Sequence, residues 1–322
     1  MSGKVRGTNE MEIIQYSESK KNIWNTFNKK SKNGLFLFNR DYMDYHSDRF
    51  KDHSLCVYNE KKRLIALLPA NELDGTLFSH QGLTFGGFII GKEIRTFIML
   101  EVFNALLSYL KKKGFHTLQY KPSPYIYHKE GAQNDLYALF KHKAQIVQCD
   151  LTTTIYLQEQ FKYSKGRKWT INKAKKESID LCESNDYLGF WKLLSQILDQ
   201  NHAIKPVHSL HEIQKLSTLF KSEIRLFLAK KKGAILAGAL IYENDLVAHT
   251  QYLANSEKGR TIGALDLLID HLINVVFKEK KYFNFGASTE DGGQILNKGL
   301  VSQKEGFGGR GVVQQIYEVS VC

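Results

Sequence analysis

The chain has 322 residues, 43% of them hydrophobic, and a formal net charge of +12. This apolar content is too high for a globally disordered chain, and the length is typical of about two domains of roughly 150 residues each. The excess of Lys and Arg predicts an anionic partner, which is nucleic acid, a nucleotide cofactor or an anionic membrane surface.

No segment predicts export or membrane insertion. The N-terminal "MSGKVRGTNEMEIIQYS" lacks the apolar core of a signal peptide. The longest apolar stretch, at 233–242, is shorter than the about 20 residues that a membrane helix needs. The four cysteines form no C-x-x-C pair, which argues against structural zinc and a disulfide framework. We therefore expect a cytoplasmic protein with no integral membrane segment and no metal.

The first half of the chain predicts one series of elements. Its apolar residues alternate, or recur at helical spacing, between polar and glycine-containing turns. In chain order we expect a hairpin at 55–73, a glycine-interrupted strand at 75–90, a helix at 94–113, a strand at 115–122, a helix at 132–143 and a strand at 144–157.

The second half repeats this order with little sequence identity. We expect a hairpin at 224–244, a strand at 246–254, a polar loop at 255–263, a helix at 264–281, a strand at 282–288, a helix at 292–307 and a strand at 311–321. The pattern predicts an α/β (α+β) protein of two similar domains, 1–150 and 151–322, each a mixed sheet flanked by helices. The final strand, 312–322, is a candidate to pack back toward the first domain.

A basic segment lies between the two halves. Residues 162–176 contain seven Lys or Arg and no acidic residue. As a helix, the segment would place four lysines and a tryptophan on one face: Lys162, Lys165, Trp169, Lys173 and Lys176. Such a face can hold phosphates and stack a base. The alternative is a solvated helix face.

These features resemble a known family. The β-loop-α-β-α-β order resembles the core of the GNAT acyltransferase fold, and two tandem units with a basic helix between them are similar to its Fem-type (FemAB-like) branch. That branch includes aminoacyltransferases that build peptidoglycan cross-bridges from aminoacyl-tRNA. The strings that carry the resemblance span most of the chain: "LFLFNRDYMDYHSDRF" (35–50), "SHQGLTFGG" (79–87), "KPVHSLHE" (205–212), "VAHTQYLANSEKGRTIGALDLL" (247–268) and "FNFGASTEDGGQILNKGLVSQKEGFGG" (283–309).

The resemblance implies a donor site before the long helix of the second half. In GNAT enzymes, a loop with the pattern Arg/Gln-x-x-Gly-x-Gly/Ala holds the pyrophosphate of coenzyme A on backbone N–H groups at a helix N-terminus. Arg260 and Gly263 match this pattern, whereas Leu265 replaces its last small residue. Gly259 and Arg167 are further candidates for cofactor binding.

The final helix carries a lysine that the resemblance singles out. Read as a helix, 294–310 places Leu296, Leu300 and Phe307 in one apolar stripe, with Lys304 at its border. The K-x-x-F spacing of Lys304 and Phe307 matches the end motif of the tRNA-dependent relatives, where this lysine is thought to stabilise negative charge during acyl transfer. A cation against apolar surface acts strongly on a nearby oxyanion. The alternative is a packed stem with the ammonium in water.

Two histidines are candidates for the general base. His249 lies in the strand that lines the reaction cleft of GNAT-like folds, and period-two alternation places it opposite Ala248, Thr250 and Tyr252. His208 follows a proline-containing turn that can direct its side chain. An imidazole of near-neutral pKa suits removal of a proton from an ammonium. A structural role is the alternative for each.

Candidate contacts to the acceptor are spread over both halves. Tyr42, Tyr45 and His46 would share a helix face, and they form either an acceptor pocket or half-buried packing. Tyr252 and Glu290 are further candidates, although Glu290 precedes the final helix and could instead cap it. The first half lacks the pyrophosphate-loop pattern, so we expect its domain to shape the substrate site.

We therefore predict an N-acyltransferase. In the preferred reaction, an acetyl group moves from acetyl-CoA (or another acyl group from its acyl-CoA) to an amine. This amine belongs to a cell-envelope or polysaccharide precursor such as an amino sugar. The acceptor would be a small molecule or a lipid- or nucleotide-linked precursor. One alternative donor is aminoacyl-tRNA, which would make tRNA a partner, and the net charge and Trp169 favour it. A further alternative is a basic nucleic-acid-binding protein without catalysis.

Overall fold

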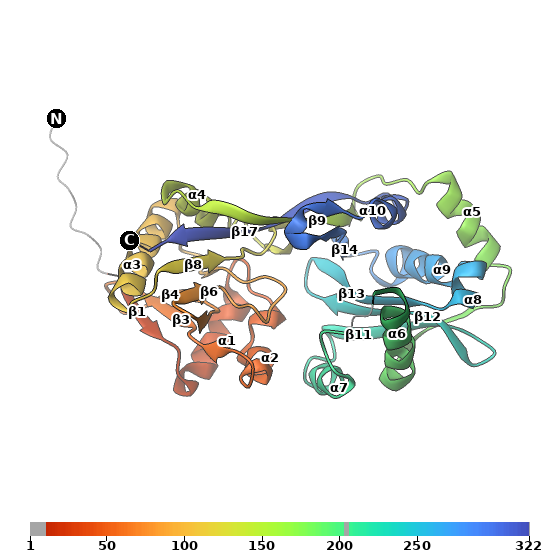
Figure 1. The fold of residues 1–322 in the computed structure, drawn as a ribbon, viewed down its shortest axis with the longest axis horizontal. Helices are drawn as coiled ribbons and strands as arrows, with labels where there is room; N and C mark the ends of the chain where they lie inside the picture. The colour runs from red at the N-terminus through yellow and green to blue at the C-terminus, as the bar shows by residue number, and fades with distance from the viewer. Residues whose placement is uncertain (1–10, 203–205, 322) are drawn as a thin grey trace. The chain divides into compact units, whose positions relative to one another are not determined.

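The computed structural model describes residues 11–202 and 206–321. These residues form two compact units, which are drawn in Figure 1. The first unit comprises the chain up to Cys149 and the segment from Gln314 onward, and the second comprises Asp150–Val313. Strands β9 (Gln145–Tyr156) and β17 (Arg310–Ser320) each run through a boundary between the units.

The first unit contains two sets of paired strands. One is an antiparallel sheet in the order β1-β3-β4-β7: β1 (Glu12–Gln15), β3 (Leu55–Tyr58), β4 (Leu64–Leu68) and β7 (Ile89–Ile90). The other follows the order β17-β8-β6-β5-β2, in which β6 and β8 are parallel: β2 (Lys51–Asp52), β5 (Asn71–Leu73), β6 (Thr76–Phe78) and β8 (Thr117–Tyr120).

Four α-helices accompany these strands: α1 (Lys21–Lys30), α2 (Arg40–Met43), α3 (Thr96–Lys112) and α4 (Asn134–Lys141). Helix α3 buries Met99, Val102, Phe103, Leu106 and Leu110. Their spacing of three and four residues puts them on one helix face, and this face packs into the core that the strands share. The predicted helix at 94–113 is thus confirmed.

The second unit is built on a sheet in the order β10-β11-β12-β13-β14-β9. Its strands are β10 (Asp180–Ser184), β11 (Ile224–Lys231), β12 (Ala234–Glu243), β13 (Val247–Asn255) and β14 (Tyr282–Ala287). Only the β13–β14 pair is parallel among the described pairs of this sheet. A short antiparallel pair follows: β15 (Thr289–Glu290) and β16 (Ile295–Leu296).

The helices of the second unit are α5 (Lys165–Ala174), α6 (Tyr187–His202), α7 (Leu210–Leu219), α8 (Glu257–Ile262), α9 (Ala264–His271) and α10 (Lys298–Glu305). Helix α5 packs on α9, and α6 packs on β13 (Figure 1). Short 3-10 or π segments complete the described chain: Glu18–Lys20, Phe36–Phe38, Asp44–His46, Tyr125–Tyr127, Leu272–Val276 and Asp291–Gly293.

Two helix boundaries of the second half differ from the prediction. The loop predicted at 255–263 contains α8, because the Ser256 side chain caps this short helix by accepting from the Gly259 N–H. The helix predicted at 264–281 stops being α-helical at His271 and continues only as a π-helical turn, Leu272–Val276.

The final helix is also shorter than predicted. It begins at Lys298, because Ile295 and Leu296 pair with β15 and the Asn297 side chain caps the helix by accepting from the Leu300 N–H. Leu296 is exposed, so it is not part of an apolar stripe with Leu300. The predicted stripe is wrong for Leu296, because this residue is in a strand and helical spacing does not apply to it.

A β-bulge in β13 changes which side chains share a face. The register between β12 and β13 shifts so that Gln251 is an extra residue. Ala248 lies in the apolar core that includes α9, whereas Tyr252 packs against Trp191 of α6. The predicted placement of Ala248 and Tyr252 on one face is therefore wrong, because one extra residue reverses the period-two alternation.

Candidate functional site: a cavity where two parallel strands separate

Strands β13 and β14 separate after a short parallel pairing. Their paired residues end at His249 and Asn284, although β13 continues to Asn255 and β14 continues to Ala287. The pairing between these two strands therefore stops before either strand ends. Backbone groups that would otherwise bond across the pair need other partners beyond this point.

A cavity of 510 Å³ lies where the two strands separate. Its lining includes side chains from β13, α8, α9, β14 and α10: Leu253, Arg260, Leu265, Phe285, Lys304 and Phe307. The lining thus combines apolar side chains with two cations, Arg260 and Lys304, and one carboxylate, Asp266. Apolar walls with a few placed polar groups are typical of small-molecule sites.

Lys304 reaches from α10 to the end of β14. Its ammonium donates to the Gly286 carbonyl at 3.0 Å, to the Ala287 carbonyl at 2.6 Å and to the Ser288 hydroxyl at 2.8 Å. The residue is only 5% exposed, so the ammonium is held inside the protein and does not extend into water. Burial lowers the pKa of Lys304 to about 8. The lysine therefore provides the partners that β13 no longer gives to this end of β14.

His249 is held beside this lysine as a neutral imidazole. The Gly286 N–H donates to Asn284 Oδ1 at 2.9 Å, which identifies that atom as the amide oxygen. His249 Nδ1 lies 2.7 Å from the same oxygen, so Nδ1 carries the proton and donates, and Nε2 is the basic nitrogen. Burial lowers the pKa of His249 to about 4, and the charge of Lys304 adds to this effect.

Arg167 of α5 contacts three residues that line the cavity. Its guanidinium forms an ion pair with Asp266, donates to the Gln303 carbonyl at 3.2 Å and lies 4.4 Å from the centre of the Phe307 ring. Asp266 is in the first turn of α9, where a carboxylate interacts favourably with the helix dipole. Arg167 therefore connects α5 to residues that line the cavity.

The two predicted loop glycines are packed, each for a different reason. A Cβ on Gly259 would lie 2.4 Å from the Leu236 carbonyl oxygen, so α8 approaches β12 too closely for any side chain. Gly263 has a φ of +79° and ends α8, and a Cβ there would lie 2.6 Å from the Thr170 side chain of α5.

The N-terminus of α9 is consequently covered. Gly263 and Ala264 are both buried, with α5 packed against them, and Asp266 already supplies a negative charge there. Arg260 is exposed and lines the cavity. Of the residues predicted to hold a pyrophosphate, Arg260 and Arg167 lie at the cavity, whereas a diphosphate could reach the Gly263 amide only if α5 moved.

His208 lies next to Tyr252. Its Nδ1 is 2.7 Å from the Tyr252 hydroxyl, and the two rings meet edge to face at 5.9 Å. His208 is buried, and burial raises the pKa of Tyr252. Neither residue is part of the lining of the 510 Å³ cavity. The structure thus brings Lys304, Arg260, Arg167 and the neighbouring His249 together, and it places His208 in a separate cluster.

The predicted acceptor residues belong to two different units. Tyr42 is buried, with its ring 5.6 Å from that of Tyr45, so the packing alternative describes this pair. The side chain of His46 lies outside the described residues. Glu290 accepts a hydrogen bond from the Asn297 side chain at 3.0 Å. It therefore positions the residue that caps α10.

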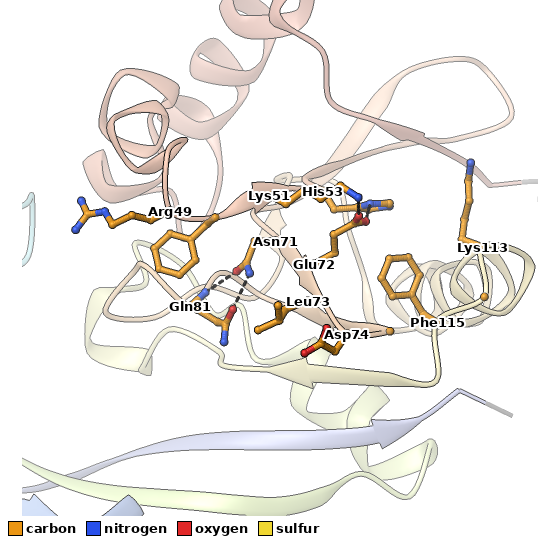
Figure 2. A pocket seen from close by; sticks show the side chains of 13 residues that line it. Arg49, Lys51, His53, Asn71, Glu72, Leu73, Asp74, Gln81, Lys113 and Phe115 are labelled. Carbon is orange, nitrogen blue, oxygen red and sulfur yellow. Dashed lines mark hydrogen bonds and ion pairs between the residues drawn. The ribbon is translucent and has the colours of Figure 1, made fainter.

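A separate cavity of 740 Å³ in the first unit is lined mostly by polar and charged residues (Figure 2). On one side of it, Glu72 accepts from His53 Nδ1 at 2.5 Å and forms an ion pair with Lys51. On another side the amides of Asn71 and Gln81 are joined by hydrogen bonds, which Figure 2 marks as dashed lines. The first half of the chain thus contains a site that the sequence reasoning did not find.

Sequence reasoning also missed Asn284 and Asp266. Each is a polar residue at a buried position of an otherwise apolar element, "YFNFG" for the first and "ALDLLI" for the second. A buried polar side chain needs a hydrogen-bonded or charged partner. Both residues can be recognised in this way from the sequence. Their partners, His249 and Arg167, cannot.

Comparisons with known proteins were made for sequence and for structure. No protein-family model matches the sequence, and no curated protein sequence matches it. Solved structures do match. The crystal structure of FemX has a TM-score of 0.67 at 10% identity, with 95% of this chain and 96% of FemX covered.

Two further structures are similar. The C-terminal domain of a putative lysylphosphatidylglycerol synthetase from Agrobacterium fabrum has a TM-score of 0.60 at 11% identity, with 95% of this chain and 92% of that chain covered. A conserved protein of unknown function from Bacteroides thetaiotaomicron has a TM-score of 0.62 at 9% identity, with 97% and 99% covered. At these identities the likeness shows the fold.

The predicted fold class is confirmed by these matches. The chain has mixed sheets flanked by helices, and its fold is that of FemX over nearly its whole length. Within residues 11–202 and 206–321, no group of three His, Cys, Asp or Glu side chains is arranged to hold a metal ion. No helix in this part of the chain is long and apolar enough to span a membrane. The expected Fem-type resemblance therefore holds at the level of the fold.

Proposed function

We propose that the protein is an N-acyltransferase and that acyl transfer takes place in the 510 Å³ cavity of the second unit. The observation that carries this proposal is the separation of β13 from β14 with a buried lysine ammonium at its edge. The cavity combines apolar walls for an acyl group with a fixed positive charge. A preorganised charge in a poorly hydrated site is the main device by which proteins stabilise a developing oxyanion.

The transfer requires one bond to form and one to break. A neutral amine attacks the acyl carbon, the carbonyl oxygen becomes negative, and the ester or thioester bond breaks when the carbonyl re-forms. The ribose oxygen of tRNA or the sulfur of coenzyme A leaves and takes up a proton from water. The proton of the amine leaves to water or to a base. Lys304 would act on the oxyanion through its charge, since its three N–H groups already have acceptors. His249, with a pKa of about 4, is a weak base, and we assign it the role of a neutral neighbour of Lys304.

Although the sequence pattern led us to expect acetyl-CoA first, we propose aminoacyl-tRNA as the donor, for two reasons. Gly263, which the resemblance assigns to the coenzyme A diphosphate, is buried, and its Cβ position lies against Thr170 of α5. Helix α5 itself presents Trp169, which is 66% exposed, among the exposed lysines Lys165 and Lys168. An exposed aromatic ring within a basic surface can stack a base while the cations contact phosphates. Acetyl-CoA remains the second candidate, supported by Arg260 at the cavity.

The acceptor in this proposal is an amine of a cell-envelope or polysaccharide precursor, such as an amino sugar. The polar cavity of the first unit supports this class. Its lining includes amides and carboxylates, from Asn71, Gln81, Glu72 and Asp74, which are groups that form hydrogen bonds with hydroxyl groups (Figure 2). Phe115 adds an aromatic surface for the apolar face of a sugar ring. The first unit would thus bind the acceptor.

Thermal unfolding of the full-length protein tests the donor. A ligand at about 100 times its Kd stabilises the native state by about 2.7 kcal/mol. Stabilisation by uncharged tRNA alone supports the preferred donor, and stabilisation by acetyl-CoA alone replaces it. Binding of tRNA that falls steeply with salt, without any transfer from aminoacyl-tRNA, would instead identify a nucleic-acid-binding protein without catalysis.

Substitution of Lys304 tests the chemistry once a donor is known. Lys304→Met should lower kcat/KM by about 10²–10³, which is the range expected when one source of electrostatic stabilisation of the oxyanion is removed. Lys298→Met is the matched control, because Lys298 is an exposed lysine on the same helix. A loss of less than about threefold for Lys304→Met would remove the lysine from the mechanism.

A further inference from the structure

The first unit contains a second cavity, of 660 Å³, whose lining is strongly basic. Five cations contribute to it: Lys29, Lys30, Arg63, Lys92 and Lys129. The carboxylates in the same lining are Glu93 and Glu130, so the cavity has an excess of three positive charges. It shares no lining residue with the polar cavity of this unit or with the transfer cavity.

The cations come from four segments that are distant in the sequence. Lys29 and Lys30 end α1, and Arg63 is in the turn between β3 and β4. Lys92 precedes α3, and Lys129 precedes α4. A run of lysines along one helix is usually a solvated face. Cations that the fold collects from four segments around a cavity require another explanation.

Backbone hydrogen bonds tie these segments together beneath the cations. The Lys32 N–H donates to the Ile90 carbonyl at 2.9 Å, and the Lys32 carbonyl accepts from the Lys129 N–H at 2.8 Å. The Gly91 N–H donates to the Ile65 carbonyl at 3.0 Å. A Cβ on Gly91 would lie 2.7 Å from that carbonyl oxygen, so glycine permits the close approach. The positions of the cations are therefore set by a hydrogen-bonded floor.

The charges within the cavity are only partly balanced. Glu130 lies 3.5 Å from Lys92, but no ion pair joins Lys29, Lys30 or Arg63 to a carboxylate of the described residues. Gathering like charges costs free energy that an anionic ligand would recover. Apolar side chains belong to the lining as well, among them Phe27, Ile65 and Ile94.

We propose that this cavity binds a small molecule that carries two or more phosphoryl groups. A diphosphate presents several anionic oxygens in different directions, and cations arriving from four segments can contact them together. The part of the ligand attached to the phosphates would contact Ile65, Ile94 and the Phe27 ring. The proposal is independent of acyl transfer, since none of these residues belongs to the second unit.

Calorimetric titration of the full-length protein tests this site. The probes are inorganic pyrophosphate, adenosine diphosphate and geranyl diphosphate, at low and at physiological ionic strength. Tighter binding of one diphosphate ester than of pyrophosphate identifies whether a nucleoside or a lipid chain occupies the apolar part. The triple variant Lys30→Gln/Arg63→Gln/Lys92→Gln should bind pyrophosphate at least about tenfold more weakly, at roughly two- to threefold for each exposed cation.

Two control variants make the result decisive. Lys61→Gln/Lys111→Gln/Lys112→Gln removes the same charge from exposed positions of the first unit outside the cavity, and it should change the Kd by less than about twofold. Glu93→Gln should tighten binding, because it removes a repulsive charge from the lining. Equal weakening by both triple variants, or no binding of any probe, would overturn the proposal.

Discussion

The burial of Lys304 predicts a pH dependence of stability that a single substitution reveals. The folded state lowers the pKa of this lysine from 10.5 to about 8. Keeping the ammonium charged inside the protein thus costs about 3 kcal/mol, at about 1.4 kcal/mol for each pKa unit.

The sign of the effect follows from the proton that each state binds. Below a pH of about 8 the lysine is charged in both states, and the full cost is present. Between a pH of about 8 and one of about 10.5, the folded state loses its proton while the unfolded state keeps it, so stability rises with pH. Lys304→Met abolishes this rise. The free energy of unfolding of the wild type minus that of the variant should therefore increase by about 2 kcal/mol from pH ~7 to pH ~10.

Urea unfolding followed by tryptophan fluorescence measures this difference, because other groups that titrate in this range cancel between the two proteins. Lys298→Met, at an exposed position of the same helix, should give a difference that does not change with pH. A flat difference for Lys304→Met would refute the reasoning, since it would mean that the ammonium keeps its ordinary pKa in the folded protein.

Three further outcomes are expected. Gly259→Ala should destabilise the protein by about 2–4 kcal/mol in thermal unfolding, because its Cβ would meet a backbone carbonyl of β12. The Cβ of Gly166→Ala, in contrast, would meet nothing within 4 Å, so this variant should stabilise α5 by up to about 1 kcal/mol. Asn284→Asp places a carboxylate beside Nδ1 of His249 and should raise the pKa of that histidine, as measured by NMR titration; an unchanged pKa would contradict the assigned contact. Trp169→Ala should weaken tRNA binding by about 1–3 kcal/mol without changing the unfolding temperature, and equal affinity would exclude the ring from the interface.

The sequence predicted the elements whose side-chain periodicity is unbroken. Helix α3 has apolar residues at three- and four-residue spacing along its length. The hairpins at 55–73 and 224–244 have charged turns between apolar strands, and both are present as β3–β4 and β11–β12. Periodicity reflects burial of one face of an element. It is therefore readable wherever an element lies against one core.

The sequence could not place residues where a local feature interrupts that periodicity. The extra residue Gln251 reversed the alternation of β13, and the pairing of Leu296 with β15 removed it from the final helix. A bulge or a two-residue strand leaves no periodic signal, because its cause is a hydrogen bond to a segment elsewhere in the chain.

The chemical site depended on tertiary structure for the same reason. The sequence indicated Lys304 and His249 as candidates, through family resemblance and residue type. Only the fold decided that β14 carbonyls would surround the lysine and that the histidine would be buried, and therefore neutral, beside Asn284. Charge, pKa and exposure depend on partners that are distant in the chain. Composition thus determined that this protein is basic and has apolar cores, and the fold determined which cations became buried, paired or gathered around a cavity.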